Sequence, residues 1–202
     1  MKTHKYERPV INMIRIKGNE VSEKYAEIVG QSWKNAKYDL IYQDATTPEN
    51  YPEKTKLEFG LKTSGREVRE FTETEKAVWH SHYTAWSTAS RKSNPMVIIE
   101  HDSLLLKPID HTFKLLEYYD ILGISHCGVL SARPDKQWGR LSAGSGYILT
   151  PKVAKLMVER LPKRITFNSD AYIHNYINQY GAFFPQHVTQ FYIPSLGTTI
   201  KH

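Results

Sequence analysis

Two carboxylates follow a short apolar run near the middle of the chain. Glu100 and Asp102 come directly after residues 96–99, whose sequence is MVII. In an extended strand, side chains two positions apart share a face, so both carboxylates would point together while His101 points away. Carboxylate oxygens suit hard cations such as Mg²⁺ or Mn²⁺, which bridge phosphate oxygens and act as a Lewis acid toward a departing diphosphate. The pair therefore predicts a divalent-metal site, or else the two carboxylates cap the turn after the strand.

A helix precedes this strand and would help to position the pair. Thr72, followed three residues later by Glu75, is typical of a capping box at a helix N-terminus. Trp79, Tyr83 and Trp86 then recur at helical spacing, which predicts an aromatic face. An aromatic stripe of this kind indicates either core packing or a stacking platform. An Asn-Pro pair ends the helix, because a residue before proline is driven out of the α region.

The rest of the chain alternates short strands with helices, which predicts an α/β fold with a mostly parallel sheet. We expect one compact domain over residues 1–202, with long loops at about 43–71 and 125–142. In the first helix, the side chains of Val21, Tyr25, Ile28 and Val29 should face the core. The predicted strands are 9–14, 38–42, 96–99, 121–124, 146–149 and 182–184, and the predicted helices are 20–32, the one beginning after Thr72, 110–119, 151–161 and 169–180.

Composition excludes several classes of protein. With 202 residues, 40% of them hydrophobic and 24% charged, the chain is long enough for a real core. No apolar run is long enough to span a bilayer, and no secretory signal is recognisable at the start. The single cysteine, Cys127, excludes an internal disulfide framework and fits a reducing cytoplasm. The net charge of +6 permits a polyanionic partner, but the basic residues are scattered, so a nucleic-acid partner is possible but unsupported.

Other chemistries have little support in the sequence. His80 and His82 lie two apart on the predicted helix, where side chains point in nearly opposite directions and cannot readily chelate one ion. For His82, a hydrogen-bonded, partly buried histidine is the simpler interpretation. No nucleophile elbow, phosphate-binding P-loop or dinucleotide fingerprint is present. Residues 144–146, Gly-Ser-Gly, lead into a strand rather than a helix, which argues against a phosphate cradle but permits a close backbone approach to a ligand.

Several segments together resemble glycosyltransferase family 25, the lipooligosaccharide galactosyltransferase-like family. VINMIR is similar to the family's opening V-I-N-L, and VIIEHDSLLL to its I-L-E-D-D-x-x-L. TETEKAVWHSHYTAWSTA is similar to its L-T-x-x-E-x-G-C-x-x-S-H-x-x-x-W helix, with Ser81, His82 and Trp86 in register. SAGSGYILTPKVAKLM resembles its G-x-x-x-Y-x-I-x-x-x-A-x-x-L block, and FNSDAYI its V-D-x-x-L element. FFPQHVTQ and SLGTTI resemble its closing pattern.

The resemblance implies a GT-A fold, which is Rossmann-like, and a metal-dependent hexosyltransferase. It implies a uridine-diphosphate sugar donor and a divalent metal at Glu100 and Asp102, with His187 as a further ligand. Asp170 would either act as general base on the acceptor hydroxyl or position that acceptor; inversion at the sugar carbon needs such a base. Independently of the family, Asp170 could simply complement the dipole of its helix.

The resemblance also implies the surroundings of the nucleotide. Asn12 and Asp44, at the ends of the first two strands, would lie beside it together with Glu100. Ser81 and His82 would brace this pocket from the central helix. The acceptor would be a saccharide of a surface glycan such as lipopolysaccharide.

One departure from the family pattern leaves alternatives open. The central acid of E-D-D is His101 here. If that aspartate is the essential ligand, metal binding is weakened, which favours a catalytically degenerate member that binds nucleotide or glycan. A third possibility is a glycosyltransferase acting on modified DNA. The sequence does not specify the donor sugar, the acceptor, the linkage or the oligomeric state.

Overall fold

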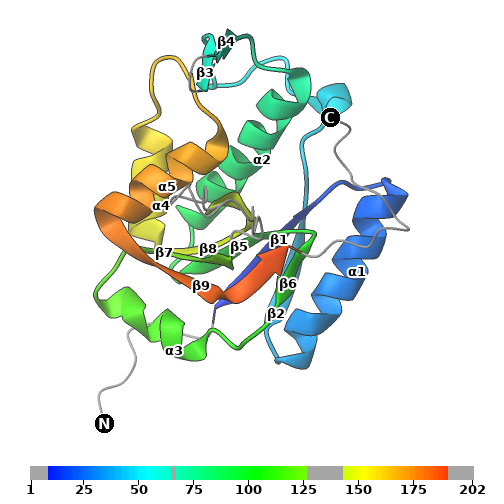
Figure 1. The fold of residues 1–202 in the computed structure, drawn as a ribbon, viewed down its shortest axis with the longest axis vertical. Helices are drawn as coiled ribbons and strands as arrows, with labels where there is room; N and C mark the ends of the chain where they lie inside the picture. Colours follow the sequence, from blue (N-terminus) through cyan, green and yellow to red (C-terminus); the bar gives the residue numbers. More distant parts are fainter. Residues whose placement is uncertain (1–8, 65–66, 127–142, 191–202) are drawn as a thin grey trace, which may run out of the picture.

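The fold is built on one mixed β-sheet. The computed structural model of the chain describes residues 9–64, 67–126 and 143–190. Its seven-stranded sheet has the order β2-β1-β5-β8-β7-β9-β6 (Figure 1). Strands β1, β2, β5, β7 and β9 run in one direction, while β6 and β8 run in the other. The prediction of an α/β sheet in which most strands run in parallel is therefore confirmed, with β8 reversed inside the sheet and β6 reversed at its edge.

The strands that position the candidate site residues, β1, β2 and β5, lie near their predicted places. The sheet strands are β1 (Val10–Arg15), β2 (Asp39–Asp44), β5 (Met96–Glu100), β6 (Ser103–Leu105), β7 (Ile121–His126), β8 (Gly146–Leu149) and β9 (Gly181–Gln190). A separate two-stranded hairpin is formed by β3 (Lys62–Ser64) and β4 (Glu67–Arg69).

Polar residues cap the N-termini of the long helices, as their sequence predicts. The Asn19 side chain accepts from the Ser22 amide, and the Asn168 side chain accepts from the Ala171 amide. Thr72 and Glu75 form the full capping box. The α-helices are α1 (Glu20–Asn35), α2 (Glu73–Ala89), α3 (Asp110–Phe113), α4 (Pro151–Glu159) and α5 (Ser169–Tyr180), and the 3₁₀ turns are η1 (Pro48–Asn50), η2 (Lys114–Glu117) and η3 (Ala143–Ser145).

Helices cover both faces of the sheet (Figure 1). Because successive strand residues face opposite sides, β5 sends Met96 and Ile98 into one core and Val97 and Ile99 into the other. The first core contains residues of α2, α4 and α5; the second contains residues of α1 and of the α3–η2 segment. Thus β5, buried on both faces, brings the acidic pair at its end to the centre of the sheet.

Some sequence-based expectations need correction. The segment 43–71 is not structureless: it contains η1 and the β3–β4 hairpin. The predicted helix over 110–119 is a single α-turn followed by a 3₁₀ turn, and the strand at 182–184 is part of the longer β9. Ile28 is 42% exposed rather than buried. Cys127, most of the predicted loop 125–142 and the SLGTTI motif lie outside the described residues.

No helix in the described ranges combines the length and apolar character needed to cross a bilayer.

Candidate functional site

Glu100 is the last residue of β5, and strand pairing places it in the middle of the sheet. Ile14 of β1 is its register partner on one side, and Gly146 of β8 pairs with the preceding Ile99 on the other. In open α/β sheets, ligands bind beyond the carboxyl ends of such strands. The expected alternation is visible in the contacts. Glu100 faces α2, where it meets His82, while the His101 ring packs edge-on against Tyr25 of α1, 6.1 Å away.

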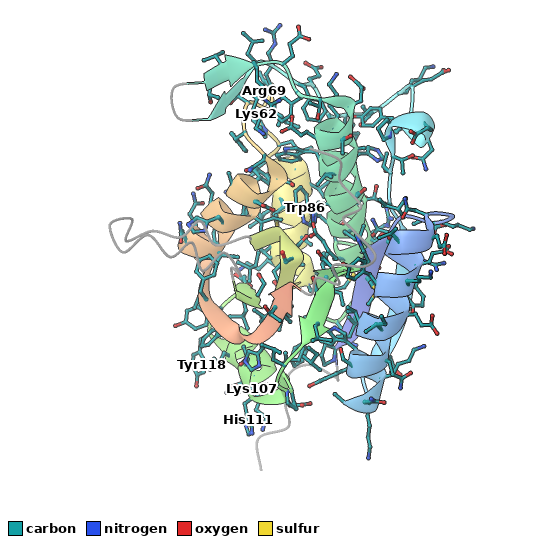
Figure 2. The ribbon with its side chains drawn as sticks, turned by 45° about the vertical axis from the view of Figure 1, so that its right-hand side comes forward. Lys62, Arg69, Trp86, Lys107, His111 and Tyr118 are labelled. Atoms are coloured by element: carbon teal, nitrogen blue, oxygen red, sulfur yellow. The ribbon has the colours of Figure 1, made fainter. Side chains whose placement is uncertain are left out.

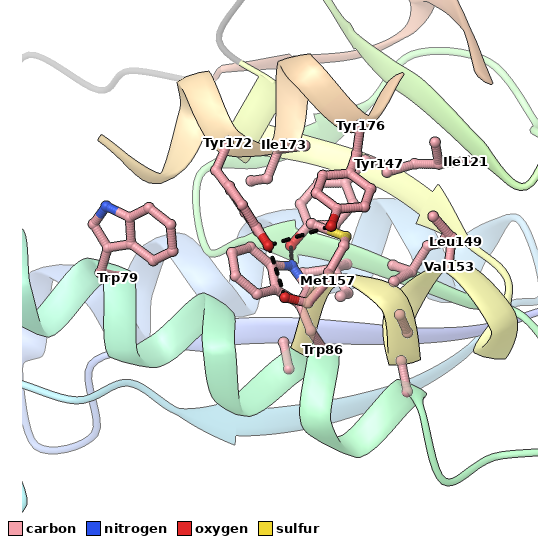
Figure 3. Close-up of a cluster of buried hydrophobic side chains, with 14 of the residues drawn as sticks. Trp79, Trp86, Ile121, Tyr147, Leu149, Val153, Met157, Tyr172, Ile173 and Tyr176 are labelled. Atoms are coloured by element: carbon pink, nitrogen blue, oxygen red, sulfur yellow. Dashed lines mark hydrogen bonds between the residues drawn. The ribbon is translucent and has the colours of Figure 1, made fainter. Parts of the chain in front are cut away.

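A chain of polar contacts runs from the core to Glu100. The indole Nε1 of Trp86 donates to the Tyr147 hydroxyl at 2.8 Å (Figure 3). That hydroxyl also lies 3.0 Å from His82 Nδ1. An indole N–H can only donate, so the Tyr147 oxygen accepts it and its own proton goes to His82 Nδ1. The remaining proton of neutral His82 is then on Nε2, which lies 3.4 Å from Glu100 Oε1. His82 is thus both a buried core histidine and a neighbour of the acidic pair.

The two carboxylates of the pair have opposite electrostatic environments. Burial raises the pKa of Glu100, but the hydrogen bond from His82, together with electrostatic contributions from the His82 and His101 side chains, outweighs it and leaves the pKa below its usual value. Burial, followed by repulsion from Glu100, raises the pKa of Asp102 to about 7. Moreover, Asp102 Oδ1 is buried and has no hydrogen-bond partner within the described part of the chain.

Asp170 joins this group from the first turn of α5. A Cβ atom placed on Gly144 would lie 2.2 Å from Asp170 Oδ1 and 3.6 Å from His82 Nε2. Gly144 therefore lies against both side chains, and its amide hydrogen-bonds the Asp170 carboxylate. Burial, then repulsion from Glu100, raises the pKa of Asp170 to about 6, although His82 and the Gly144 amide act in the opposite direction. Asp170 does more than complement a helix dipole, because it belongs to the same electrostatic cluster as Glu100.

Asp102 and Glu100 offer carboxylate oxygens, which are suitable ligands for a divalent cation. An oxygen that is buried, acidic and unpartnered is costly unless a cation or proton compensates it. Over the described ranges, however, no three His, Cys, Asp or Glu side chains are arranged as a ready-made metal site. A cation held here would have to complete its coordination with water or with ligand oxygens, as Mg²⁺ commonly does.

His187 does not join the acidic pair as a third ligand. Its Nε2 lies 2.6 Å from Thr112 Oγ1, and its Nδ1 lies 3.2 Å from the Lys107 carbonyl oxygen. A carbonyl can only accept, so Nδ1 carries the proton and Nε2 accepts from Thr112. Both ring nitrogens are therefore occupied, and the buried ring connects β9 to the segment that leads into α3.

Asn12 and Ser81 form a second polar connection, beside the acidic cluster. Asn12 is 2% exposed and donates to the Gln43 side chain at 2.8 Å, which in turn donates to the Ser81 carbonyl. The Ser81 hydroxyl accepts from the Thr46 amide at 2.9 Å and donates to the Ala77 carbonyl. These bonds attach the end of β2 to α2. His80, on the other side of the helix, bonds Thr46 Oγ1 rather than sharing an ion with His82.

Asp44 ends β2 at the same edge of the sheet as Glu100. Its side chain is 51% exposed and lies 3.5 Å from Lys17 Nζ and 4.0 Å from an Arg15 nitrogen. It is therefore open to a ligand approaching this edge.

Sequence reasoning overlooked Tyr147, Gly144 and Arg15. Tyr147 and Gly144 belong to the SAGSGYIL block that carried the family resemblance, and Gly144 lies in the Gly-Ser-Gly segment for which a close backbone approach was expected. That approach is to Asp170 rather than to a ligand. Arg15 gave no signal, because one arginine at a strand end is ordinary.

Comparisons with known proteins add a limited likeness. No protein-family model matches the sequence, and no curated protein matches it. Among solved structures, a glycosyltransferase involved in the glycosylation of the major capsid of PBCV-1 is similar, with 11% identity, a TM-score of 0.44, and coverage of 90% of this chain and 94% of that one. Mouse xyloside xylosyltransferase 1 in its apo form shows 9% identity, a TM-score of 0.43 and coverage of 89% and 79%.

A third similar structure is the glycosyltransferase GlyE of Streptococcus pneumoniae TIGR4. It has 10% identity and a TM-score of 0.41, with 87% of this chain and 45% of that chain covered. All three are glycosyltransferases by name. At these identities and scores the likeness carries no argument about activity, which must come from the site itself.

Proposed function

We propose that this protein is a metal-dependent glycosyltransferase of the GT-A type, which moves a hexose from a uridine-diphosphate sugar to an acceptor hydroxyl. The acceptor would be a saccharide of a surface glycan. One observation carries the proposal: the buried Oδ1 of Asp102, which has no hydrogen-bond partner in the described segments, lies at the carboxyl end of the central strands. It is in electrostatic contact with Glu100, which also raises the pKa of Asp170. The motifs resembling glycosyltransferase family 25 supply the class of donor.

The acidic residues divide into two roles. Asp102 and Glu100 would hold the cation, which, when bound, stabilises negative charge on the departing diphosphate. Glu100 stays ionised beside His82, and a cation would lower the pKa of Asp102 by opposing its repulsion from Glu100. Bringing the two carboxylates together thus concentrates negative charge that a bound cation, or a proton in its absence, would balance.

Asp170 would receive the proton of the acceptor hydroxyl. As that oxygen bonds the anomeric carbon of the sugar, the bond from this carbon to the diphosphate oxygen breaks, and the configuration inverts. A pKa of about 6 leaves the Asp170 carboxylate ionised at neutral pH yet more basic than an ordinary aspartate. The Gly144 amide holds it in place. Asp44, at the end of β2, would lie beside the nucleotide.

A second candidate function is nucleotide or glycan binding without catalysis. It is favoured by His101, which stands where the family pattern has an aspartate and whose ring packs on Tyr25 instead of joining the acidic pair. This protein would still bind the donor, but without metal-dependent turnover.

The first experiment measures release of uridine diphosphate from a panel of uridine-diphosphate sugars, with and without Mn²⁺, for wild type and Asp102→Ala. Slow release that needs Mn²⁺ and disappears in the variant supports the enzyme, and the most active sugar names the donor. Binding of the nucleotide by calorimetry, with no release even when acceptor saccharides are added, favours the non-catalytic candidate. If the wild type neither binds nor hydrolyses any of these compounds, the uridine-donor proposal is wrong.

A further inference from the structure

Arg15 is the last residue of β1, next to the strand that carries Glu100. Its register partner in β2 is Asp44, and the preceding Ile14 pairs with Glu100. Arg15 therefore ends at the same edge of the sheet as the acidic pair. Its guanidinium lies over the Tyr42 ring, 4.7 Å from the centroid, and its side chain is only 26% exposed.

Among the described residues, this guanidinium has charged neighbours at ion-pair distance but no hydrogen-bond acceptor. Glu23 is 3.9 Å away and Asp44 is 4.0 Å away, and both distances exceed hydrogen-bond length. Arg15 Nε is buried and has no acceptor among the described residues. A guanidinium is a fork of N–H donors that cannot be deprotonated in proteins, so leaving a half-buried one unbonded is costly.

The surroundings hold Arg15 in one place without satisfying it. The cation–π contact with the Tyr42 ring restricts the movement of the guanidinium. Glu23 is itself engaged, because its Oε1 accepts from the Gly18 amide at 2.9 Å. Asp44 is shared with Lys17, which is nearer to it, at 3.5 Å. An oxygen-rich ligand arriving at this edge would therefore meet a fixed donor set whose protein contacts are long and easily replaced.

We propose that Arg15 donates hydrogen bonds to oxygen atoms of the donor nucleotide, held in position by Tyr42. This inference rests on the proposed function and adds a nucleotide-recognition residue to it. Phosphate oxygens and base carbonyl oxygens present the same acceptor chemistry to a guanidinium, and both belong to a uridine diphosphate. Asp44, exposed beside Arg15, would be released from its long ion pair to face the same ligand.

The test is calorimetric binding of uridine diphosphate, uridine monophosphate and uridine to wild type, Arg15→Gln, Arg15→Lys and Lys17→Gln. Loss of charged hydrogen bonds predicts that Arg15→Gln weakens uridine diphosphate binding about 10-fold or more. Arg15→Lys keeps the charge but not the fork and should recover only part of it. Lys17→Gln is the matched control, since Lys17 has the same Asp44 neighbour but is 69% exposed, and it should change binding less than about 3-fold.

The ligand series identifies the contact. A loss confined to the phosphorylated ligands assigns Arg15 to phosphate, while an equal loss for uridine assigns it to the nucleoside. If the wild type binds uridine diphosphate and folded Arg15→Gln binds it equally well, this inference is overturned while the proposed function stands. If the wild type binds no nucleotide, both are overturned. Far-ultraviolet circular dichroism and thermal melting of each variant separate lost binding from lost folding.

Discussion

Gly144 and Asp170 approach so closely that no side chain fits between them: a Cβ on Gly144 would lie 2.2 Å from Asp170 Oδ1. The two residues come from different elements, η3 and the first turn of α5. Their contact brings the Asp170 carboxylate to His82 and Glu100.

Gly144→Ala should therefore displace the Asp170 carboxylate and lower turnover of the proposed transferase on the order of 100-fold, the effect of misplacing a reacting group by about 1 Å. The measurement is uridine diphosphate release in the presence of Mn²⁺. Gly146→Ala is the matched control, because its Cβ would meet Val188 at an ordinary 3.4 Å. Equal activity of the two variants would contradict the importance of the Gly144–Asp170 contact.

Removing the charge of Asp102 should change how stability depends on pH. In the folded state its pKa is raised to about 7, above the value of about 3.9 in an unfolded chain. The folded state thus binds the proton more tightly, so this contribution to stability is present below about pH 4 and is lost as the pH rises toward 7. In EDTA, Asp102→Asn should melt at a higher temperature than wild type at pH 8, and the difference should shrink toward pH 5.

The pKa of Asp170 is also raised, so part of the pH dependence of stability will persist in the Asp102→Asn variant. Mn²⁺ offers an independent check, because it should raise the melting temperature of wild type at pH 8 much more than that of Asp102→Asn. If the melting temperature of the wild type were the same from pH 5 to pH 8 and unaffected by Mn²⁺, the proposed destabilisation by the ionised, buried Asp102 carboxylate would be ruled out.

Tyr147→Phe should test whether the Tyr147 hydroxyl positions His82 for activity as well as stabilising the core. Loss of the hydroxyl leaves Trp86 Nε1 and His82 Nδ1 without their shared partner, which should cost about 1–3 kcal/mol in the free energy of unfolding. It also removes the proton that fixes the tautomer of His82, so donation from His82 to Glu100 should weaken and turnover should fall.

Tyr172→Phe is the control for this variant, because it loses a buried hydroxyl that donates to the Met157 carbonyl at 2.7 Å in the same aromatic core (Figure 3). Chemical denaturation of both variants should give similar destabilisation, whereas only Tyr147→Phe should reduce uridine diphosphate release. A parallel loss of activity in Tyr172→Phe would mean that general loosening of the core, rather than the His82 tautomer, is responsible.

The β3–β4 hairpin is attached to α2 through one carboxylate. Lys62 and Arg69 come from the two strands of the hairpin (Figure 2). Glu75 accepts two hydrogen bonds from Arg69, each 2.8 Å, pairs with Lys62, and caps the amide of Thr72. Chiefly because of the Arg69 bonds, the pKa of Glu75 lies well below its usual value. The stability it supplies is therefore present above the unfolded pKa of about 4.3 and is lost as the pH falls below it.

Glu75→Gln should lower the free energy of unfolding by about 2 kcal/mol at pH 7, with a difference that narrows below pH 4. Glu73→Gln provides the comparison, since Glu73 is 63% exposed and pairs with the neighbouring Lys76, and it should cost less than about 0.5 kcal/mol. Urea titrations at pH 7 and pH 3.5 check both values. Equal costs at pH 7 would show that the shared carboxylate does not hold the hairpin.

Local signals in the sequence were sufficient to find most of the elements. The capping box at Thr72 and Glu75 set the start of α2 correctly, because it depends on residues within three positions of one another. The alternation of Glu100 and His101 across β5 also followed from strand geometry. By contrast, β6 and the full length of β9 were missed, because a short or irregular strand is specified by its partner in the sheet.

The amino-acid sequence by itself determined the α/β class, the helix caps and the acidic pair at the end of a buried strand, since these arise from backbone geometry and hydrophobic periodicity over a few residues. Only the tertiary structure decided which distant side chains meet. It brought Asp170 and Gly144 to His82, directed His82 to Glu100 through Tyr147, and occupied both nitrogens of His187 elsewhere. It also placed Arg15 beside Asp44 at a distance longer than a hydrogen bond. These contacts join residues that are far apart in the sequence. They are fixed by the packing of the two cores rather than by any local sequence pattern.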